Sequence, residues 1–391
     1  MIGNDTALGD TTGATSVASG GTLDVNGHFL GREQLYLDGG GLVNRGAGRD
    51  IAFRRLTVRS NSTIGGSGSF GIRKADDANS LLRVDAGAVL QKVDTNSFVL
   101  GGLPVVVDGR FELRAGGIVV WGGTTFSGSG DFLLDTGGVF VLLPDKNGLD
   151  VSSDVRVEGA VVDVFGDSAA GRVDFSKTLT LEGATATVNC LSNAIASGTL
   201  VGSARLRKWG DSSLVLAGDN GAYRGVLDVV SGTLRIGNGG GTGSVASDSI
   251  LVGASLVFDH TGAKTFAGAI AGNGRLARRG SGTDIFTGNL THKGGTSIEA
   301  GTLQIGAGGS AGSIVGTIID DGTLVFEHAS GTMIYFSDSI RGTGSLVKRG
   351  ASVLVLGGRN SYTGTTTVSG GKLVVTGALG GTSVSVANGA S

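Results

Sequence analysis

The chain has 391 residues, of which 75 are Gly and two are Pro, and its 31 basic and 33 acidic residues leave a net charge of −2 at pH 7. The low Pro count excludes a collagen triple helix, the 40% of hydrophobic residues excludes a disordered linker, and the balanced charge argues against a nucleic-acid-binding protein. The longest stretch without Gly covers residues 49–64, and Gly inside a helix costs about 1 kcal/mol relative to Ala, so long helices are excluded as well.

Short apolar runs separated by Gly-containing turns predict strands along the whole chain. In the N-terminal half one pattern recurs at residues 37–43, 84–90, 113–119 and 134–140. It consists of an apolar residue, often followed by an acid, then one or two Gly and an alternating apolar run. In the C-terminal half the same pattern recurs at residues 298–303 and 319–324. Gly and Asp supply the conformations that tight turns need. The clearest neighbouring turns, such as those at Gly116 and Gly137, are separated by about 21 residues.

A repeated unit of this length in a chain of strands is typical of one rung of a parallel β-helix. We therefore predict an all-β, right-handed parallel β-helix of about 17 rungs, each of about 21–24 residues, with Val, Leu, Ile and Phe stacked in the interior. Because a solenoid lengthens without splitting into domains, residues 1–391 are expected to form a single domain.

One residue gives an indication of the compartment. Cys190 is the single cysteine, so the chain cannot form an internal disulfide. Avoidance of Cys is typical of chains that cross a membrane unfolded as well as of cytosolic proteins. No apolar run reaches the roughly 20 residues that a membrane-spanning helix needs.

Three longer repeats occupy residues 201–391. The segment Leu346-Val347-Lys348-Arg349-Gly350 has counterparts at residues 276–280 and 206–210, so the repeat has a period of about 70 residues. A Gly-x-Leu segment follows each copy, at residues 232–234, 301–303 and 371–373. We interpret one repeat as three rungs of about 23 residues. Residues 1–200 share only the general rung pattern and are predicted to form divergent rungs.

The last copy, residues 348–375, contains Asn360-Ser361-Tyr362-Thr363-Gly364, a Thr-rich strand and Gly-x-Leu. It closely resembles the autotransporter passenger-associated strand repeat. The copy at residues 206–236 departs from this pattern but keeps Tyr223, and the copy at residues 276–305 lacks the Tyr. The strong match covers about 30 residues, and the degenerate pattern extends over the C-terminal half.

The resemblance implies a passenger of Gram-negative type V secretion. Such passengers are long β-helices, are exported unfolded, and are displayed on the extracellular face of the outer membrane or secreted. Many act as adhesins or aggregation factors. The implied partners are therefore a host cell surface, an extracellular matrix component or further copies of the chain. Nucleic acid is not an expected partner, and membrane contact is expected only through a barrel domain outside this chain.

Repeated acids are the first catalytic candidates, because carbohydrate-active enzymes on this fold use acids on neighbouring rungs. Adjacent acids occur at Asp76-Asp77 and Asp320-Asp321. Four further acids recur at a spacing of about 23 residues, namely Asp85, Asp108, Asp131 and Asp154. Asp85 and Asp320 occupy the turn position before Gly, which favours a short polar side chain. No cluster of Arg, Lys or His accompanies these acids, so we predict turn residues rather than a catalytic pair.

Serine-hydrolase and metal motifs are incomplete. Residues 166–169 and 210–213 approach Gly-Asp-Ser-Gly but lack its last Gly. The calcium-type segment at residues 45–50 is a single copy, whereas calcium rolls need tandem copies. The four His residues are scattered along the chain: His28, His260, His292 and His328. We therefore predict a non-enzymatic protein without a catalytic residue, metal site or cofactor.

Two groups of basic residues are candidate contacts for an anionic ligand such as a sulfated glycan. The first group occupies one repeat position and the position after it, and we expect it to form a spaced column along one edge of the rod: Lys208, Arg278, Arg279, Lys348 and Arg349. The second group lies in an N-terminal stretch rich in Arg, which contains Arg32, Arg45, Arg49, Arg54, Arg55 and Arg59. Of these, Arg54, Arg55 and Arg59 are the contacts singled out. The alternative interpretation of both groups is an ordinary solvated face.

The leading functional hypothesis is a surface-displayed adhesin or self-association factor, in which weak contacts add up over many rungs. One alternative is a structural stalk and folding scaffold for export, with the binding function elsewhere in the protein. A less favoured alternative is a carbohydrate-active enzyme on the same fold.

Overall fold

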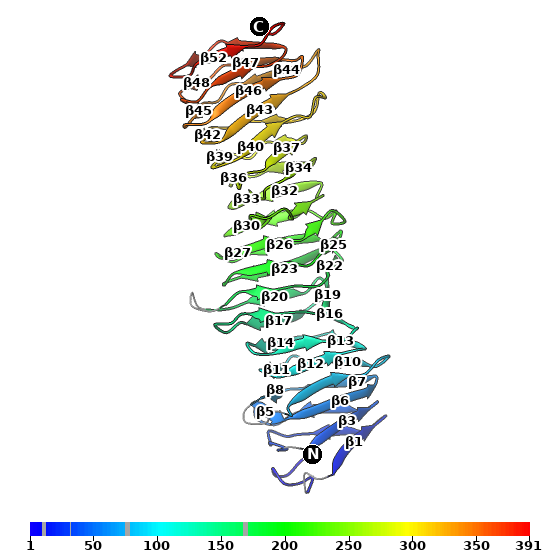
Figure 1. Ribbon diagram of the computed structural model, residues 1–391. Coiled ribbons are helices and arrows are strands. Elements are labelled where there is room, and N and C mark those ends of the chain that lie inside the picture. The colour runs from blue at the N-terminus through cyan, green and yellow to red at the C-terminus, as the bar shows by residue number, and fades with distance from the viewer. Residues whose placement is uncertain (10–12, 32, 75–78, 167–170) are drawn as a thin grey trace. The chain divides into compact units, whose positions relative to one another are not determined.

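The computed structural model describes residues 1–391 except 10–12, 32, 75–78 and 167–170. The described chain is all-β, with strands and turns alternating along its length and no helical residue (Figure 1). Among these residues there is consequently no helix that could cross a membrane. The acid pair Asp76-Asp77 and the Asp167-Ser168-Ala169 segment lie outside the described residues.

The strands pass in turn through three faces, and each described pair of neighbouring strands is parallel. This arrangement confirms the predicted parallel β-helix of about 17 turns. Its handedness stays a prediction. The chain divides into two compact units, Met1–Leu206 and Arg207–Ser391, which are described separately. The single domain expected for residues 1–391 therefore also stays a prediction.

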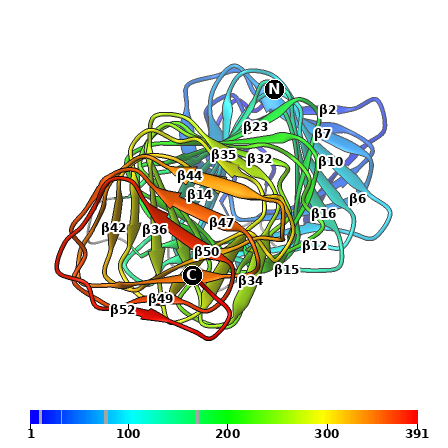
Figure 2. The ribbon, with the colours of Figure 1, turned by 90° about the horizontal axis from the view of Figure 1, so that it is seen from above.

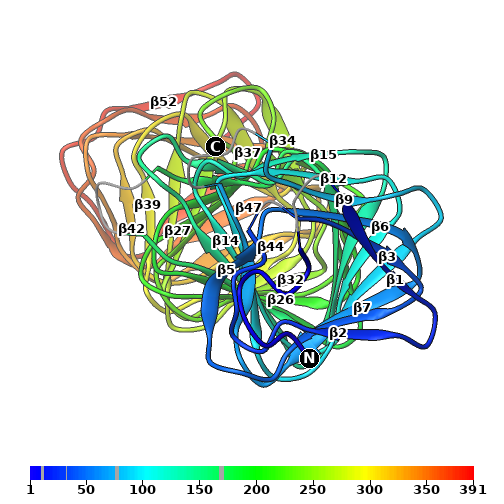
Figure 3. The ribbon, with the colours of Figure 1, turned by 90° about the horizontal axis from the view of Figure 1, so that it is seen from below.

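In the first unit the three faces are visible from below as separate groups of strands (Figure 3). The first face contains β1 (Ala14–Ala18), β3 (Gln34–Asp38), β6 (Arg55–Ser60), β9 (Leu81–Val84), β12 (Pro104–Val107) and β15 (Thr125–Ser127), and then β18 (Leu149–Asp150), β21 (Val173–Asp174) and β24 (Ala194–Ala196). The second contains β2 (Thr22–Asp24), β4 (Gly41–Asn44), β7 (Ser62–Gly66), β10 (Val89–Lys92), β13 (Arg110–Leu113), β16 (Asp131–Asp135), β19 (Asp154–Glu158), β22 (Leu179–Glu182) and β25 (Leu200–Gly202). The third contains β5 (Arg49–Phe53), β8 (Phe70–Arg73), β11 (Ser97–Gly101), β14 (Gly116–Trp121), β17 (Gly138–Leu143), β20 (Val161–Val164) and β23 (Thr185–Cys190).

The second unit repeats this plan, and the view from above separates its faces (Figure 2). One face contains β26 (Arg205–Trp209), β29 (Leu227–Val229), β32 (Ser249–Val252), β35 (Ala269–Ala271), β38 (Asn289–Leu290) and β41 (Ser313–Ile314), and then β44 (Met333–Phe336), β47 (Val353–Leu356) and β50 (Lys372–Val375). The next contains β27 (Ser213–Leu216), β30 (Thr233–Ile236), β33 (Ser255–Asp259), β36 (Arg275–Arg279), β39 (Thr296–Ile298), β42 (Ile318–Asp320) and β45 (Ile340–Arg341), and then β48 (Arg359–Asn360) and β51 (Ala378–Leu379). The last contains β28 (Asp219–Asn220) and β31 (Ser244–Val245), and then β34 (Ala263–Phe266), β37 (Thr283–Phe286), β40 (Thr302–Ile305), β43 (Thr323–Glu327), β46 (Ser345–Arg349), β49 (Thr366–Val368) and β52 (Val384–Val386).

The length of one turn follows from the strand register. Thr366 pairs with Val384, which closes a short turn, whereas Phe70 pairs with Phe98, which closes a long one. The predicted length of about 21–24 residues therefore describes the centre of a wider range, because loops of different length connect the strands.

Columns of apolar side chains fill the interior, as the alternating pattern predicts. In the first unit six fully buried Phe rings follow one another at centroid distances of 5.4–6.4 Å, namely Phe53, Phe70, Phe98, Phe111, Phe132 and Phe140. Each buried side chain of this kind contributes roughly 1.5–3 kcal/mol. This column holds the successive turns of the first unit together.

The long repeat of the second unit does not contain a whole number of turns. Its basic segment lies on β26, β36 and β46, and consecutive copies are ten strands apart along the chain. Since one turn has three strands, a repeat makes three and one-third turns of about 21 residues each. The interpretation of one repeat as three rungs of about 23 residues is therefore wrong, and successive copies begin on different faces.

Candidate functional site

The basic residues of the repeat do not form the expected column. Lys208 lies on β26, Arg278 on β36 and Lys348 on β46, which belong to three different faces. Their exposed fractions are 0%, 1% and 0%. The expectation of a basic column along one edge is wrong for two reasons: the repeat advances by a fractional turn, and these side chains point into the solenoid.

Two of these buried residues are lysines that cap a corner of the backbone. The Nζ of Lys348 donates to the carbonyl oxygens of Arg349 at 2.6 Å, Gly350 at 2.8 Å and Gly370 at 3.2 Å. Three acceptors satisfy the three donors of an ammonium group. Burial nevertheless lowers the pKa of Lys348, because the charged form loses its hydration. The side chain therefore stabilises the corner and is unavailable to a ligand.

Lys208 makes the same arrangement in the first repeat. Its Nζ donates to the carbonyl oxygens of Trp209 at 3.0 Å and Ser231 at 3.0 Å, and also to that of Gly210. In both corners the second residue after the lysine is a Gly with a positive φ, 80° at Gly210 and 66° at Gly350. This left-handed conformation turns the carbonyl groups toward the ammonium group.

A third lysine of this kind lies in the first unit, where the sequence showed no repeat. The Nζ of Lys92 donates to the carbonyl oxygens of Val93 at 2.5 Å, Asp94 at 2.9 Å and Ala115 at 3.2 Å. Asp94 has a φ of 59° and takes the place of the Gly. Burial lowers the pKa of Lys92 to about 8. Sequence reasoning missed this corner, although Leu90-Gln91-Lys92 has the same apolar-x-Lys spacing as the repeat.

Arg278 replaces the lysine with a buried ionic network. Its Nε lies 2.6 Å from Oδ2 of Asp284, whose Oδ1 lies 2.5 Å from Nε2 of His260. Its Nη2 also donates to the carbonyl oxygen of His260 at 3.2 Å. All three side chains are buried. Arg278 is thus an internal partner of an acid, and a surface ligand cannot reach it.

The residues that follow the buried positions do face solvent. Arg279 is exposed and makes two contacts with Glu299, at 2.7 and 3.3 Å. The hydrogen bond with Glu299 raises the pKa of Arg279. Arg349 is also exposed, on a strand of another face, and its register neighbour is Glu327. These two arginines remain accessible but lie apart from one another.

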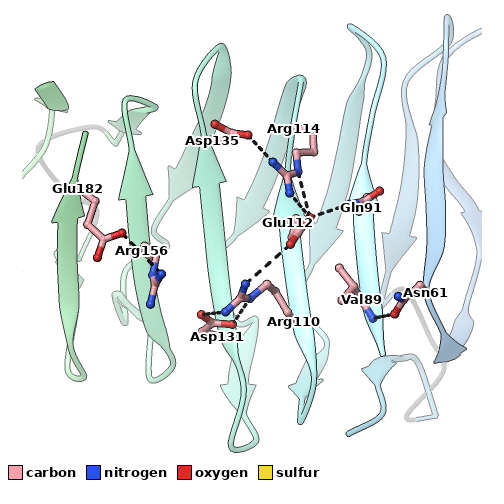
Figure 4. A network of polar contacts seen from close by, with 10 residues as sticks. All are labelled: Asn61, Val89, Gln91, Arg110, Glu112, Arg114, Asp131, Asp135, Arg156 and Glu182. Carbon is pink, nitrogen blue, oxygen red and sulfur yellow. Dashed lines mark hydrogen bonds and ion pairs between the residues drawn. The ribbon is translucent and has the colours of Figure 1, made fainter. Parts of the chain in front are cut away.

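Arginines lie beside the repeated acids, so the expectation that no basic residues accompany them is wrong. Figure 4 shows Arg110 and Arg114 between the acids of β13 and β16. Arg110 contacts both carboxylate oxygens of Asp131, at 2.8 and 3.1 Å. Arg114 lies 2.7 Å from Asp135 and 2.8 Å from Glu112. These pairs neutralise the charge of this part of the second face.

The three remaining members of the acid series also have partners. Asp85 and Asp108 both contact Arg83, at 2.7 and 2.6 Å. Asp154 accepts a hydrogen bond from the backbone N–H of Thr178 at 3.0 Å. Asp131 and Asp154 begin strands, so the predicted turn position applies to Asp85 but not to them.

The two residues of the described acid pair, Asp320 and Asp321, lie in different environments. Asp320 is fully buried, and burial raises its pKa to about 6. Asp321 is exposed, and hydrogen bonds from the backbone and side chain of Thr343 lower its pKa. Divergent pKa values are typical of acid–base pairs, but the buried carboxyl of Asp320 cannot reach a substrate at the surface.

The His residues are likewise held by protein groups. His292 Nε2 lies 3.0 Å from the Thr296 hydroxyl, His328 Nε2 lies 2.9 Å from the carbonyl oxygen of Gly312, and His28 Nδ1 lies 3.0 Å from Asp5. Within the described parts of the chain, no group of three or more His, Cys, Asp or Glu residues could hold a metal ion.

The N-terminal basic group divides between two places. Arg59 lies near the end of β6. Its Cζ lies 3.3 Å from the centroid of the Tyr36 ring, and its Nη1 lies 3.8 Å from Oδ1 of Asp38. Arg55 begins the same strand and is half-buried, and its Nε has no hydrogen-bond partner among the described residues. Arg54 instead lines a hollow on the other side of the corner. The structure therefore does not bring all three predicted contacts together.

This hollow, which we call the arginine hollow, is a candidate binding site in the first unit. It has a volume of about 420 Å³, and its lining residues are Phe29, Arg49, Asp50, Ile51, Arg54 and Arg73. Among the described lining residues three arginines face one acid, so this part of the lining carries an excess of positive charge. Of the three residues singled out as anion contacts, only Arg54 belongs to it, together with Arg49 of the same Arg-rich stretch. Arg73 and Phe29 were missed as contacts.

A second hollow of about 350 Å³ lies in the second unit over β36, β39, β42 and β45. Small residues such as Ala277, Ser297 and Gly295 form its lining, together with Arg275, Glu299 and Arg341. Its described lining contains no aromatic side chain.

Comparison with known proteins identifies the repeats. The passenger-associated-transport-repeat family matches residues 206–236, 276–305 and 346–375. These ranges are the three copies found in the sequence, so the predicted resemblance is confirmed. The chain is also similar to "Adhesin BmaC autotransporter" of Brucella suis biovar 1 (strain 1330), with 34% identity over 202 residues, which covers 46% of this chain and 6% of that relative. No solved structure matches the chain.

Proposed function

We propose that this chain, an autotransporter passenger with three passenger-associated transport repeats, is a non-enzymatic adhesin that acts at the bacterial surface or after secretion. Its partner would be a host cell surface, an extracellular matrix component or another copy of the chain. The observation that carries this proposal is the similarity to a relative named as an adhesin. The chain spans 6% of that relative's length, so its binding activity is proposed on its own account.

The distribution of charge supports binding rather than catalysis. Acids at the surface of the first unit are paired with arginines, as Asp131 is with Arg110, and the raised pKa of Asp320 belongs to a buried group. A solenoid presents its exposed side chains at regular spacing on each face, which suits a partner bound by many weak contacts.

A folding scaffold for export is a second candidate function for the repeats themselves. Their signature residues are buried: Tyr362 is 0% exposed and its hydroxyl lies 2.6 Å from Thr366, and Asn360 is 1% exposed and donates to the carbonyl oxygen of Gly358 at 3.0 Å. Lys348 is buried in the same way. We propose that the repeats stabilise the solenoid and that partner binding occurs mainly on other residues.

The test uses beads coated with the full chain and cultured host cells. Coated beads are expected to attach to cells well above albumin-coated beads, and free chain is expected to compete with them. Sedimentation of the chain over a range of concentrations then separates self-association from heterologous binding. Beads that attach no better than albumin beads, together with a chain that stays monomeric, would show that the adhesin proposal is wrong and leave the scaffold role.

A further inference from the structure

The arginine hollow joins segments from successive turns of the first unit. Phe29 lies in the connection between β2 and β3, Arg49 and Ile51 belong to β5, Arg54 lies between β5 and β6, and Arg73 ends β8. The hollow is thus built on a corner of the solenoid, where neighbouring strands hold its walls. Its volume of about 420 Å³ falls within the range of small-molecule sites in proteins.

Aromatic rings orient the guanidinium groups of the hollow. The Cζ atoms of Arg54 and Arg49 lie 5.5 and 5.9 Å from the centroid of the Phe29 ring. Arg73 lies 4.3 Å from the centroid of the Trp121 ring. A ring that covers the flat face of a guanidinium leaves the N–H groups at its edge free to donate. The aromatic contacts themselves use none of the arginines' hydrogen-bonding capacity, although Nη1 of Arg49 donates to the carbonyl oxygen of Gly27 at 3.4 Å.

Arg54 carries the most direct sign of a missing ligand. Its Nε and Nη1 are shielded from solvent and have no hydrogen-bond partner in the described structure. Buried donors without an acceptor are unfavourable and rare in proteins. Asp50, the one acid among the described lining residues, makes no contact with Arg54 that would satisfy these atoms. An oxyanion in the hollow would supply the acceptors once the Arg54 side chain turns these two donors toward it.

Among the described residues, one acid outside the lining contacts Arg49. Asp5 lies 3.8 Å from Nη2 of Arg49. Asp5 also accepts a hydrogen bond from the backbone N–H of Phe29 at 3.0 Å, which lowers its pKa and keeps it ionised. It thus fixes the loop that carries Phe29 as much as it neutralises Arg49.

We propose that the arginine hollow binds an oxyanion group, a sulfate ester or a carboxylate, of an acidic polysaccharide. The proposal rests on the adhesin function, because a polysaccharide at a cell surface or in the matrix would be the partner. Guanidinium groups match the geometry of both oxyanions and bind them through charge-assisted hydrogen bonds. The open hollow accepts a charged group that projects from a polymer chain.

The test titrates the full chain with two short oligosaccharides of equal length, one carrying only sulfate groups and one carrying only carboxylate groups. Trp121 fluorescence, measured in a Trp209→Phe background so that Trp121 is the one remaining tryptophan, reports binding, because Arg73 lies against this ring. We expect saturable, salt-sensitive binding, and we expect Arg54→Gln and Arg49→Gln each to weaken it by about tenfold, the effect of losing one charge-assisted contact. Arg49 is exposed, so its substitution tests the site without disturbing the fold. Arg341→Gln, in the hollow of the second unit, is the matched control and should leave binding unchanged.

The two oligosaccharides identify the source of the oxyanion, since tighter binding of one names its group and equal binding shows that the charge alone is recognised. Binding that falls equally in Arg54→Gln, Arg49→Gln and Arg341→Gln would be general adsorption and would overturn the proposal, as would the absence of binding. The bead assay keeps the adhesin proposal separate. Beads that attach equally well with wild-type chain and with Arg54→Gln would refute only the role of the hollow in attachment, whereas oligosaccharide binding by a chain that neither attaches to cells nor self-associates would refute only the adhesin function.

Discussion

The buried lysine corner of the repeat makes a specific prediction about local stability. Lys348→Met keeps the length of the side chain but removes the group that donates to the carbonyl oxygens of Arg349, Gly350 and Gly370. Each buried acceptor that loses its donor costs about 1–3 kcal/mol, while removal of a buried charge returns part of this energy. We expect a net loss of about 2–4 kcal/mol in the free energy of local opening at this corner.

Hydrogen exchange measured by mass spectrometry resolves this loss along the chain. Since about 1.4 kcal/mol corresponds to a factor of ten, the amides of residues 350–371 are expected to exchange about 30- to 700-fold faster in Lys348→Met. Arg349→Met alters the exposed neighbour on the same strand and should leave their exchange within about threefold of wild type. Equal exchange in the two variants would mean that the lysine does not support the corner, and the structural account of the repeat would then be refuted.

Three further predictions concern buried groups. Asp320 has a folded pKa of about 6, above its ordinary value of 3.8, so the folded chain binds more protons between these values and its stability falls as pH rises through them. In urea unfolding, Asp320→Asn should therefore stabilise the second unit by up to about 3 kcal/mol near pH 7.5 and by little near pH 3.5. Equal gains at both pH values would contradict this cause. Lys92 has a folded pKa of about 8, below its ordinary value of 10.5, so the unfolded chain binds more protons between these values. The stability of the first unit should therefore increase as pH rises from about 8 to 10.5 in wild type and stay level in Lys92→Met. Parallel pH profiles of the two proteins would exclude titration of Lys92 as the source. Phe98→Ala should cost about 3–5 kcal/mol in the first unit, because it opens a cavity in the Phe column; a loss below about 1 kcal/mol in urea unfolding would show that the column relaxes around the gap.

The sequence was sufficient for the fold because turn spacing and strand alternation are local signals. Gly116 and Gly137 mark corresponding turns, and the structure pairs Gly116 with Gly138 on neighbouring strands. The inward position of Lys348 was predictable on the same grounds. It lies two positions after the buried Leu346, and residues i and i+2 of a strand share one face. The expectation of an exposed basic column gave charge more weight than alternation, and alternation was correct.

The arginine hollow could not be predicted in the same way. Phe29 and Arg73 meet because of the register of irregular turns, in which Arg55 pairs with Leu81 and Phe70 with Phe98. Those turns exceed the usual length, and a shift of one residue in register moves every side chain to the opposite face. Sequence analysis found the Arg-rich stretch, but only coordinates show that Arg54 and Arg59 lie in different surroundings.

The buried signature of the repeats has a consequence for how ligand recognition varies among passengers that carry them. Lys208, Lys348, Asn360 and Tyr362 lie in the interior, so sequence similarity at these positions reports a common scaffold. Residues that contact a partner must instead be exposed and are free to differ between proteins with the same interior. The arginine hollow lies at residues 29–73, outside all three matched ranges. Two passengers can therefore share the repeats and bind different ligands, and the exposed corners of the less regular turns are where such differences should be sought.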